Sequence, residues 1–343
     1  MKRYLALAEG AFRDADESKT ARGVIAYGRD PVVAILDSTL AGERFEGIPI
    51  VARVEDALPF QPSTALVGVA PPGGVLSPAW REIVRAAVAA GLDVESGLHV
   101  YLADDIELSE LARRHGVQLR DLRRPPTDLT VPTGENVRHG ASVVLIAGSD
   151  CGTGKMTVAL ELDREARQRG LRSLFVPTGQ TGIAIAGWGI AVDSVVSDFI
   201  AGAAERLVVE GAARGDLLWV EGQASIVHPR YSGVALGLYH GTVPQLLVLC
   251  HVAGSARIAR LPEHPIPPLA KLVELHERIA LPIRPCRVAA IALNTSALDE
   301  PTAQCAIADS ETETGLVADD PVRFGAARIV DAVLAQLGSP EGR

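Results

Sequence analysis

The stretch that most constrains the fold is 143–162, VVLIAGSDCGTGKMTVALEL. An apolar run enters a glycine-rich turn with a Gly-Lys pair, and a helical pattern follows. This is the layout of a phosphate-binding loop between a buried strand and a helix. Such loops lie at the carboxyl end of a strand in a parallel sheet. The stretch therefore predicts an α/β fold with an anion site where the helix begins.

Strand–helix alternation over the rest of the chain predicts two α/β domains. The chain has 343 residues, and domains commonly contain about 100–200. A proline-rich stretch without periodicity, 123–140, separates the halves. We predict a Rossmann-like domain over 1–124, a linker over 125–140 and a P-loop NTPase-type domain with a parallel sheet over 141–343. The expected strands are 32–37, 64–70, 93–98, 117–122, 142–148, 172–178, 216–222, 245–252 and 287–294, and the expected helices are 77–91, 105–116, 194–213, 268–280 and a last amphipathic helix near the C-terminus.

Composition argues against several classes of function. With 33 basic and 42 acidic residues the net charge is −9, which disfavours a general grip on nucleic acid. We expect the basic run 112–124 to be a solvated helix face and strand end. The cysteines form no C-x-x-C pair, and no run of ~18 apolar residues is present. We expect a cytoplasmic homo-oligomer that binds small molecules, not nucleic acid or membrane.

The loop departs from the usual pattern in two ways. Five residues separate Gly148 from Gly154 where four are usual, and Met156 stands where Ser or Thr usually holds magnesium. A thioether is not a ligand for this hard cation, and we expect Thr157 to contact the α-phosphate. GSDCGTGK resembles the lengthened loop of dethiobiotin synthetase, whose relatives place an Asn against adenine. The expected nucleotide-binding residues are Gly148, Asp150, Cys151, Gly152, Thr153, Gly154, Lys155, Met156, Thr157 and Asn294, although Asn294 could equally be a simple turn former.

Carboxylates near the loop supply candidate metal ligands. Glu221 ends a predicted strand, at the edge where ligands bind in open parallel sheets. Asp193 precedes a helix and could instead be a simple N-cap, with Asp198 as a competing candidate. With Thr157, Asp193 and Glu221 form the predicted magnesium site. The predicted catalytic residues are Lys155, Glu221 and His228, where His228 is either a base active near neutral pH or a turn residue.

Further polar residues follow the strands of both halves. In the second half we expect a substrate site, in which Arg230 could clamp a carboxylate. Its candidate residues are Gln180, Thr181, Gln223, Ser225, Arg230, Tyr231 and Ser232. In the first half, GIPIVARVEDAL resembles the CoA-binding domain of succinyl-CoA synthetase, although such a domain could equally be a dimer interface. The candidate CoA-binding residues there are Ser38, Thr39, Pro72, Gly73, Gly74, Ser96 and Gly97.

Several motifs together resemble one bacterial and archaeal family from end to end. They include ILDSTLAG, GVAPPGG, SGLHVYL, GSDCGTGKMT, PTGQTGIAIAGWGIAVDSVVSDFIAGAAE and VEGQASIVHPRYSGVALGLYHG. The family was long catalogued as a domain of unknown function, with a Rossmann-like and a P-loop domain. Some members are described as D-glutamate N-acetyltransferases. In this chain Ala224 follows EGQ, where the resemblance leads us to expect glycine.

The resemblance implies transfer of an acetyl group from acetyl-CoA to the amino group of D-glutamate. The P-loop would then bind ATP with Mg²⁺, or the phosphates of CoA. Because acetyl-CoA is already activated, acetylation requires no ATP on chemical grounds. One alternative is an ATP-dependent ligase or kinase that activates a carboxylate as an acyl phosphate. Another is a nucleotide-sensing protein without catalysis.

Overall fold

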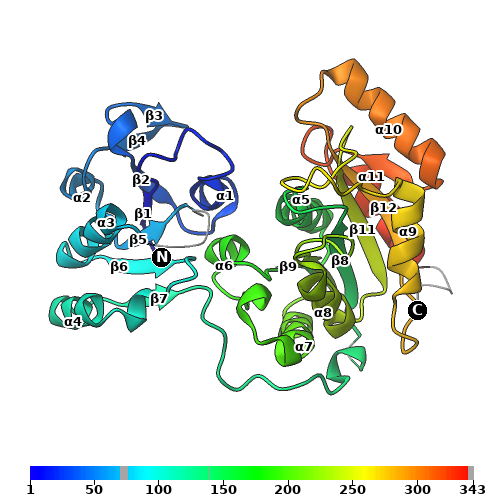
Figure 1. The fold of residues 1–343 in the computed structure, drawn as a ribbon, viewed down its shortest axis with the longest axis horizontal. Helices are drawn as coiled ribbons and strands as arrows, with labels where there is room; N and C mark the ends of the chain where they lie inside the picture. The colour runs from blue at the N-terminus through cyan, green and yellow to red at the C-terminus, as the bar shows by residue number, and fades with distance from the viewer. Residues whose placement is uncertain (70–75, 139, 339–343) are drawn as a thin grey trace. The chain divides into compact units, whose positions relative to one another are not determined.

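The computed structural model describes residues 1–69, 76–138 and 140–338. The chain divides into two compact units (Figure 1). Unit 1 contains Met1–Pro125 and Gly179–Ser194, and unit 2 contains Pro126–Thr178 and Val195–Arg343. Each unit is built on its own predominantly parallel sheet, which confirms the predicted α/β class.

Unit 1 has a seven-stranded sheet in the order β3-β4-β2-β1-β5-β6-β7. All pairs are parallel except β3 with β4. The strands are β1 (Tyr4–Leu7), β2 (Val32–Leu36), β3 (Arg44–Phe45), β4 (Ile48–Val51), β5 (Thr64–Val67), β6 (Asp93–Ser96) and β7 (Leu119–Asp121). The helices are α1 (Lys19–Tyr27), α2 (Val54–Ala57), α3 (Pro78–Ala89), α4 (Ile106–His115) and α6 (Gln180–Ala186).

Local signals explain where the predicted helices of unit 1 begin and end. The Ser77 hydroxyl accepts a hydrogen bond from the N–H of Trp80 and caps α3, and the Asp105 carboxylate caps α4 through Leu108 N–H. Gly116 then ends α4 with φ 68°, a left-handed conformation that favours glycine. The strands β1, β3 and β4 and the helix α1 were not predicted, because their apolar runs are too short to show a clear period.

Unit 2 has a six-stranded parallel sheet in the order β13-β12-β11-β8-β10-β9. Its strands are β8 (Ser142–Gly148), β9 (Ser173–Val176), β10 (Leu217–Glu221), β11 (Leu246–Val252), β12 (Arg287–Asn294) and β13 (Val317–Asp319). Its helices are α5 (Lys155–Gln168), α7 (Ile200–Ala212), α8 (Ser232–Thr242), α9 (Leu269–Arg278), α10 (Glu300–Thr314) and α11 (Ala327–Leu337). The central strand β8 lies between β10 and β11, so its carboxyl end meets the ends of both neighbours.

Two segments differ from the predicted organisation. In the expected linker, the N–H groups of Thr133 and Glu135 donate to the Glu205 carboxylate on α7 at 2.6 and 2.8 Å. Asn136 is buried there and donates to the Gly241 carbonyl at 2.7 Å. This part of the segment is therefore packed on unit 2. Residues 179–194, expected within the P-loop domain, form part of unit 1 instead, where α6 packs on α1.

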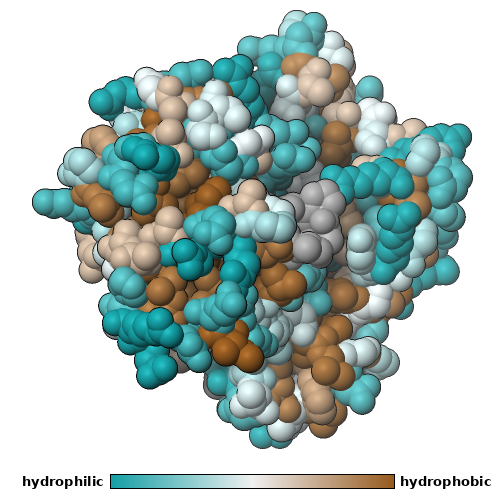
Figure 2. Space-filling view, turned by 60° about the vertical axis from the view of Figure 1, so that its left-hand side comes forward, coloured by the Kyte–Doolittle hydropathy of each residue, from teal (hydrophilic) through white to brown (hydrophobic). Residues whose placement is uncertain are grey.

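Exposed apolar residues are scattered among polar ones in the part of the chain that the structure describes. On the face shown in Figure 2, hydrophilic and hydrophobic residues are interspersed. Strongly exposed apolar residues such as Ile106, Val196 and Val322 belong to different parts of the chain. Scattered single apolar residues are usual on protein surfaces. None of the helices in the described ranges combines the length and the apolar character needed to cross a membrane.

Candidate functional site

The glycine-rich loop after β8 surrounds a buried lysine. Lys155 begins α5 and is 6% exposed. Its Nζ donates to the Asp150 carbonyl at 2.7 Å and lies 3.4 Å from Thr153 Oγ1. A Cβ on Gly148 would lie 2.8 Å from Thr153 Oγ1 and 2.9 Å from Lys155 Nζ, so the loop requires glycine there. The sequence motif thus brings Lys155 and the backbone of the loop together where α5 begins.

Nearby carboxylates offset part of the effect that burial has on the pKa of Lys155. Burial lowers the pKa of Lys155 below the usual range of lysine, whereas the nearby Asp150 and Glu221 carboxylates act in the opposite direction. The neighbouring Cys250 on β11 is fully buried, and burial raises its pKa to about 12, so it stays a neutral thiol. Two carboxylates and one ammonium therefore set the charge of this site.

Glu221 is fixed at the end of β10 by the residue that follows β9. Its Oε2 accepts the N–H of Thr178 at 2.9 Å, and the Thr178 hydroxyl donates to the Glu221 carbonyl at 2.6 Å. Gln223 Nε2 donates to the same hydroxyl at 3.0 Å. Gly222 allows β10 to pass β8 closely, since a Cβ there would lie 1.8 Å from the Ile146 oxygen. Thr178 was not predicted as a site residue, although it ends an expected strand.

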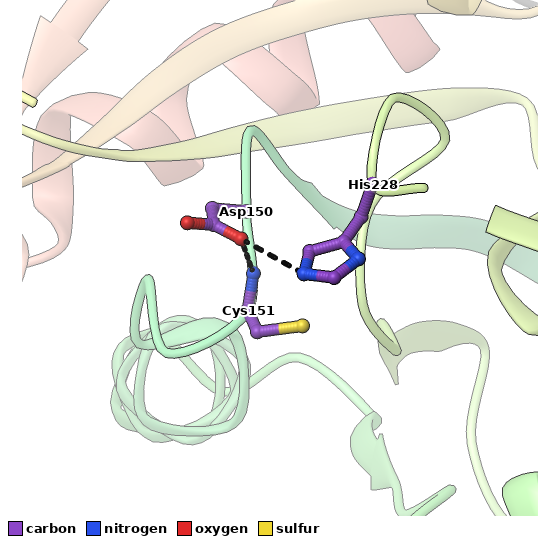
Figure 3. Close-up of side chains that lie close together, drawn as sticks. All are labelled: Asp150, Cys151 and His228. Atoms are coloured by element: carbon purple, nitrogen blue, oxygen red, sulfur yellow. Dashed lines mark hydrogen bonds and ion pairs between the residues drawn. The ribbon is translucent and has the colours of Figure 1, made fainter. Parts of the chain in front are cut away.

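Asp150 connects the loop with two other segments of unit 2, and Figure 3 shows it beside Cys151 and His228. Its Oδ1 accepts the N–H of Cys151 at 2.6 Å, and its Oδ2 accepts the N–H of Ala259, from the segment after β11, at 2.6 Å. His228 Nε2 lies 3.8 Å from Asp150 Oδ1. All of these contacts are made by a side chain that is 4% exposed. Ala259 contributes only a backbone N–H, for which the sequence carries no signal.

The second nitrogen of His228 determines what the ring can offer. Nδ1 accepts the N–H of Arg230 at 3.1 Å, so in the neutral ring the proton lies on Nε2, which faces Asp150. The sequence suggested a base at this position. The contacts favour a hydrogen-bond donor instead, because the basic lone pair is directed at the backbone.

The same geometry disfavours a metal centre at this cluster. Potential ligand atoms of Asp150, Cys151 and His228 lie within 4.8 Å of one another in the part of the chain that the structure describes. A histidine that binds a metal through one nitrogen usually donates the N–H of the other. His228 Nδ1 accepts a hydrogen bond, and Asp150 already accepts two backbone N–H groups. We therefore interpret the cluster as a hydrogen-bonded junction of loops.

The segment between β10 and α8 contains most of the other predicted substrate residues. The buried Ser225 hydroxyl accepts the N–H of Val227, and the exposed Tyr231 ring lies 4.9 Å from that of His228. Ser232 is the first residue of α8, which was not predicted as a helix. Ala224 has φ 47°, in the region that favours glycine, and it lines a cavity of about 20 Å³ beside Gly148.

The remaining residues predicted for the nucleotide lie on two elements of unit 2. Met156 and Thr157 are half-buried on the first turn of α5. Asn294 Oδ1 accepts the N–H of Ser296 at 3.1 Å, which makes a local turn after β12. The turn therefore uses the amide oxygen of Asn294. Its NH₂ group is the part of the side chain that could contact an adenine ring.

Three residues that were predicted for the site of the P-loop domain lie in unit 1, and two of them contact a buried arginine. Arg123 is 3% exposed and donates to Gln180 Oε1 and Asp193 Oδ2, each at 2.8 Å. Among the described residues its Nε has no hydrogen-bond partner. Thr181 shares a hydrogen bond of 2.7 Å with Thr20 on α1. The basic run 112–124 was expected to be solvated. Arg123 is buried instead, because it donates hydrogen bonds to two residues of the segment 179–194.

The described residues among those predicted to bind CoA make contacts with other residues of unit 1. The N–H and the hydroxyl of Ser38 donate to the Glu9 carboxylate, and Thr39 donates to Asp37. Ser96 Oγ accepts the N–H of Leu98 at 3.2 Å. At Gly97 a Cβ would lie 2.6 Å from Gln180 Cγ, so this glycine makes room for α6. Pro72, Gly73 and Gly74 lie outside the described residues.

Two α/β units, one with a lysine-bearing phosphate-loop motif, define the chain as a two-domain protein of the P-loop class. The P-loop domain of unknown function DUF1611_C matches residues 130–330, and the Rossmann-like domain DUF1611_N matches residues 38–125. The chain belongs to this DUF1611 family, which confirms the resemblance found in the sequence.

Relatives support the same membership. The chain is 37% identical over 289 residues to a D-glutamate N-acetyltransferase of Tritonibacter scottomollicae, covering 82% of this chain and 84% of that protein. It is 35% identical over 278 residues to a protein of the same name from a Pseudoalteromonas species, covering 80% and 81%. The crystal structure of a DUF1611 family protein from Anabaena variabilis superposes with a TM-score of 0.91 at 37% identity, covering 98% of this chain and 100% of that one.

Proposed function

We propose that this chain transfers the acetyl group of acetyl-CoA to the amino group of D-glutamate. The observation that carries the proposal is the similarity to two proteins named for this activity, at 37% and 35% identity over about four-fifths of the chain. The junction of polar groups at the carboxyl edge of the unit 2 sheet adds physical support. It gathers a buried ammonium, two buried carboxylates and an imidazole within one unit.

The reaction needs three contributions from the protein. The substrate ammonium must lose a proton, the amine must attack the thioester carbonyl, and the oxyanion that forms must be stabilised before the CoA thiolate leaves. We assign the proton acceptor to Glu221 and the neutral donor to Nε2–H of His228. Lys155 binds an anionic group of a substrate at the start of α5. This assignment gives each predicted catalytic residue a role that its contacts allow.

A second candidate is an ATP-dependent ligase, which the strand–loop–helix layout around Lys155 favours. Its phosphates would lie on the loop, and Mg²⁺ would be held by the oxygens of Glu221 and Thr157, which are the hard donors that this ion prefers. Met156 offers no such oxygen, and Asp193 is engaged with Arg123 in unit 1. Acetyl-CoA needs no further activation, so we place the ligase second.

The test is product analysis by mass spectrometry after incubation with D-glutamate, acetyl-CoA and Mg²⁺, with and without ATP. We expect N-acetylglutamate and free CoA in both mixtures, with ATP unchanged. Product that appears only with ATP, together with ADP or AMP, would establish the ligase. Absence of acetylated product in both mixtures would contradict the proposed function.

Replacing the buried lysine tests whether the loop takes part. We expect Lys155→Ala to lower turnover by roughly 10²–10³-fold, the effect of losing one preorganised charged donor. Lys271→Ala is the matched control, because Lys271 lies on α9 of the same unit, half exposed, and pairs with Glu274. Equal turnover in the two variants would remove Lys155 from the mechanism.

A further inference from the structure

We propose that the loop of unit 2 binds the amino-acid acceptor itself, rather than a nucleotide. In this arrangement the loop N–H groups and Lys155 hold a carboxylate, and Glu221 holds the ammonium. The inference rests on the proposed function, which supplies an α-amino acid as acceptor. It names the occupant of a site that the sequence motif assigns to phosphate.

The balance of charge is the first argument. Asp150 and Glu221 both lie beside Lys155. Lys155 Nζ donates to the Asp150 carbonyl at 2.7 Å, and a Cβ on Gly222, the residue after Glu221, would lie 3.1 Å from Lys155 Cδ. Two carboxylates and one ammonium give this part of unit 2 a formal charge of −1. An amino acid carries a cation and an anion on adjacent groups, which complements a neighbouring carboxylate and ammonium.

The contacts of the loop are the second argument. An N–H group of this loop already pairs with a carboxylate in the structure, since Asp150 Oδ1 accepts the N–H of Cys151 at 2.6 Å. Lys155 is buried, yet only two acceptors lie within reach of its three N–H bonds among the described residues. One donor therefore remains for a ligand.

The position of Met156 is the third argument. The residue after the loop lysine usually supplies the hydroxyl that binds magnesium beside the phosphates. Its replacement by a thioether removes a ligand that a triphosphate needs and a carboxylate does not.

The second carboxylate of glutamate needs a cation of its own. Arg230 lies two residues beyond His228 and has an exposed side chain, and we assign it to this carboxylate.

Steady-state kinetics with both substrates varied tests this assignment. We expect Lys155→Met to raise the KM for D-glutamate by roughly 10- to 100-fold, while the KM for acetyl-CoA stays within about twofold. The control is Lys271→Met. The opposite pattern, in which the KM for acetyl-CoA rises and that for D-glutamate does not, would place the CoA phosphates on the loop and overturn the inference.

Measurements on the unaltered protein cover the case in which Lys155→Met does not fold. Inorganic pyrophosphate should inhibit competitively against D-glutamate and not against acetyl-CoA. Calorimetric titration with D-glutamate alone should show binding that pyrophosphate abolishes. Binding of D-glutamate that is indifferent to pyrophosphate would overturn the inference. Because this titration needs no turnover, it separates a wrong occupant from a wrong reaction.

The ammonium partner has its own test. Glutarate has the two carboxylates of glutamate but lacks the amino group. The unaltered protein should bind D-glutamate more tightly than glutarate, and Glu221→Gln should lose most of this preference, because a neutral amide no longer pairs with an ammonium. An undiminished preference in Glu221→Gln would contradict the role of Glu221.

Discussion

The loop of unit 2 and the arginine cluster of unit 1 are built in different ways. In the loop, Lys155 donates to a carbonyl only five residues earlier in the sequence. In the cluster, Arg123 donates to residues that lie 57 and 70 positions later. A short motif is enough to specify the first. The second exists only because the segment 179–194 is part of unit 1.

This difference shows why the two regions were not equally predictable. The glycines of the loop predict an anion site, and this prediction does not depend on the rest of the chain. Gln180 and Asp193 look like site residues of the P-loop domain because they follow its strand, yet their contacts lie in unit 1. A covalent connection to a strand thus says little about where the next segment packs.

The largest effect that we expect comes from crowding the strands beneath the loop. In Gly222→Ala the new Cβ would lie 1.8 Å from the Ile146 oxygen on β8, so the sheet would have to open. We expect a loss of about 4 kcal/mol or more in the free energy of unfolding, measured by urea denaturation. Gly233→Ala on α8 is the control, since nothing lies within 4 Å of its Cβ position. Equal stability in the two variants would refute the close approach.

A smaller loss should follow when the arginine cluster is broken. Arg123→Met leaves Asp193 without its cation, which costs about 3–5 kcal/mol for a fully buried pair. Because Asp193 is 31% exposed, we expect roughly 2 kcal/mol, with faster proteolysis within 179–194. The neighbour Arg124 is 43% exposed, and Arg124→Met should cost less than about 1 kcal/mol. Similar losses in both variants would mean that burial does not set Arg123 apart.

A still smaller loss of stability should follow from crowding Gly97, the residue after β6, against Gln180 on α6. In Gly97→Ala the new Cβ would meet Gln180 Cγ at 2.6 Å, but a flexible side chain can move aside. We expect a loss of about 1 kcal/mol, against the larger loss at Gly222. In a double-mutant cycle, Gln180→Ala should remove most of the cost of Gly97→Ala. Strict additivity would show that the two residues are not in contact.

The smallest effect that we expect is a loss of stability at acid pH, caused by a buried histidine near the loop. His251 on β11 shares a hydrogen bond of 2.8 Å with Ser149, and burial lowers its pKa below the value of about 6.5 for an unfolded chain. The unfolded state then binds the proton more readily, so stability is complete above about pH 6.5 and falls as the pH decreases. Unfolding at pH 7.5 and 5.5 should show a smaller decrease in His251→Asn than in the unaltered protein. His264→Asn, at an exposed histidine of unit 2, is the control, and an unchanged decrease in His251→Asn would contradict the assignment.

The sequence by itself determined the α/β class, most of the long buried strands and the loop with Lys155. These features are encoded within about 20 consecutive residues, as apolar runs, glycine turns and helical spacing. Glu221 also follows from sequence, because the carboxyl ends of parallel strands share one edge.

Only the tertiary structure decided which unit receives the segment 179–194 and which groups face the loop. Thr178, Ala259 and Arg123 act through hydrogen bonds to residues that lie between 43 and 109 positions away. His228 acquires its donor character from the N–H of Arg230, a contact set by the turn before α8. Such contacts depend on how the elements pack, and packing leaves no periodic trace in the sequence.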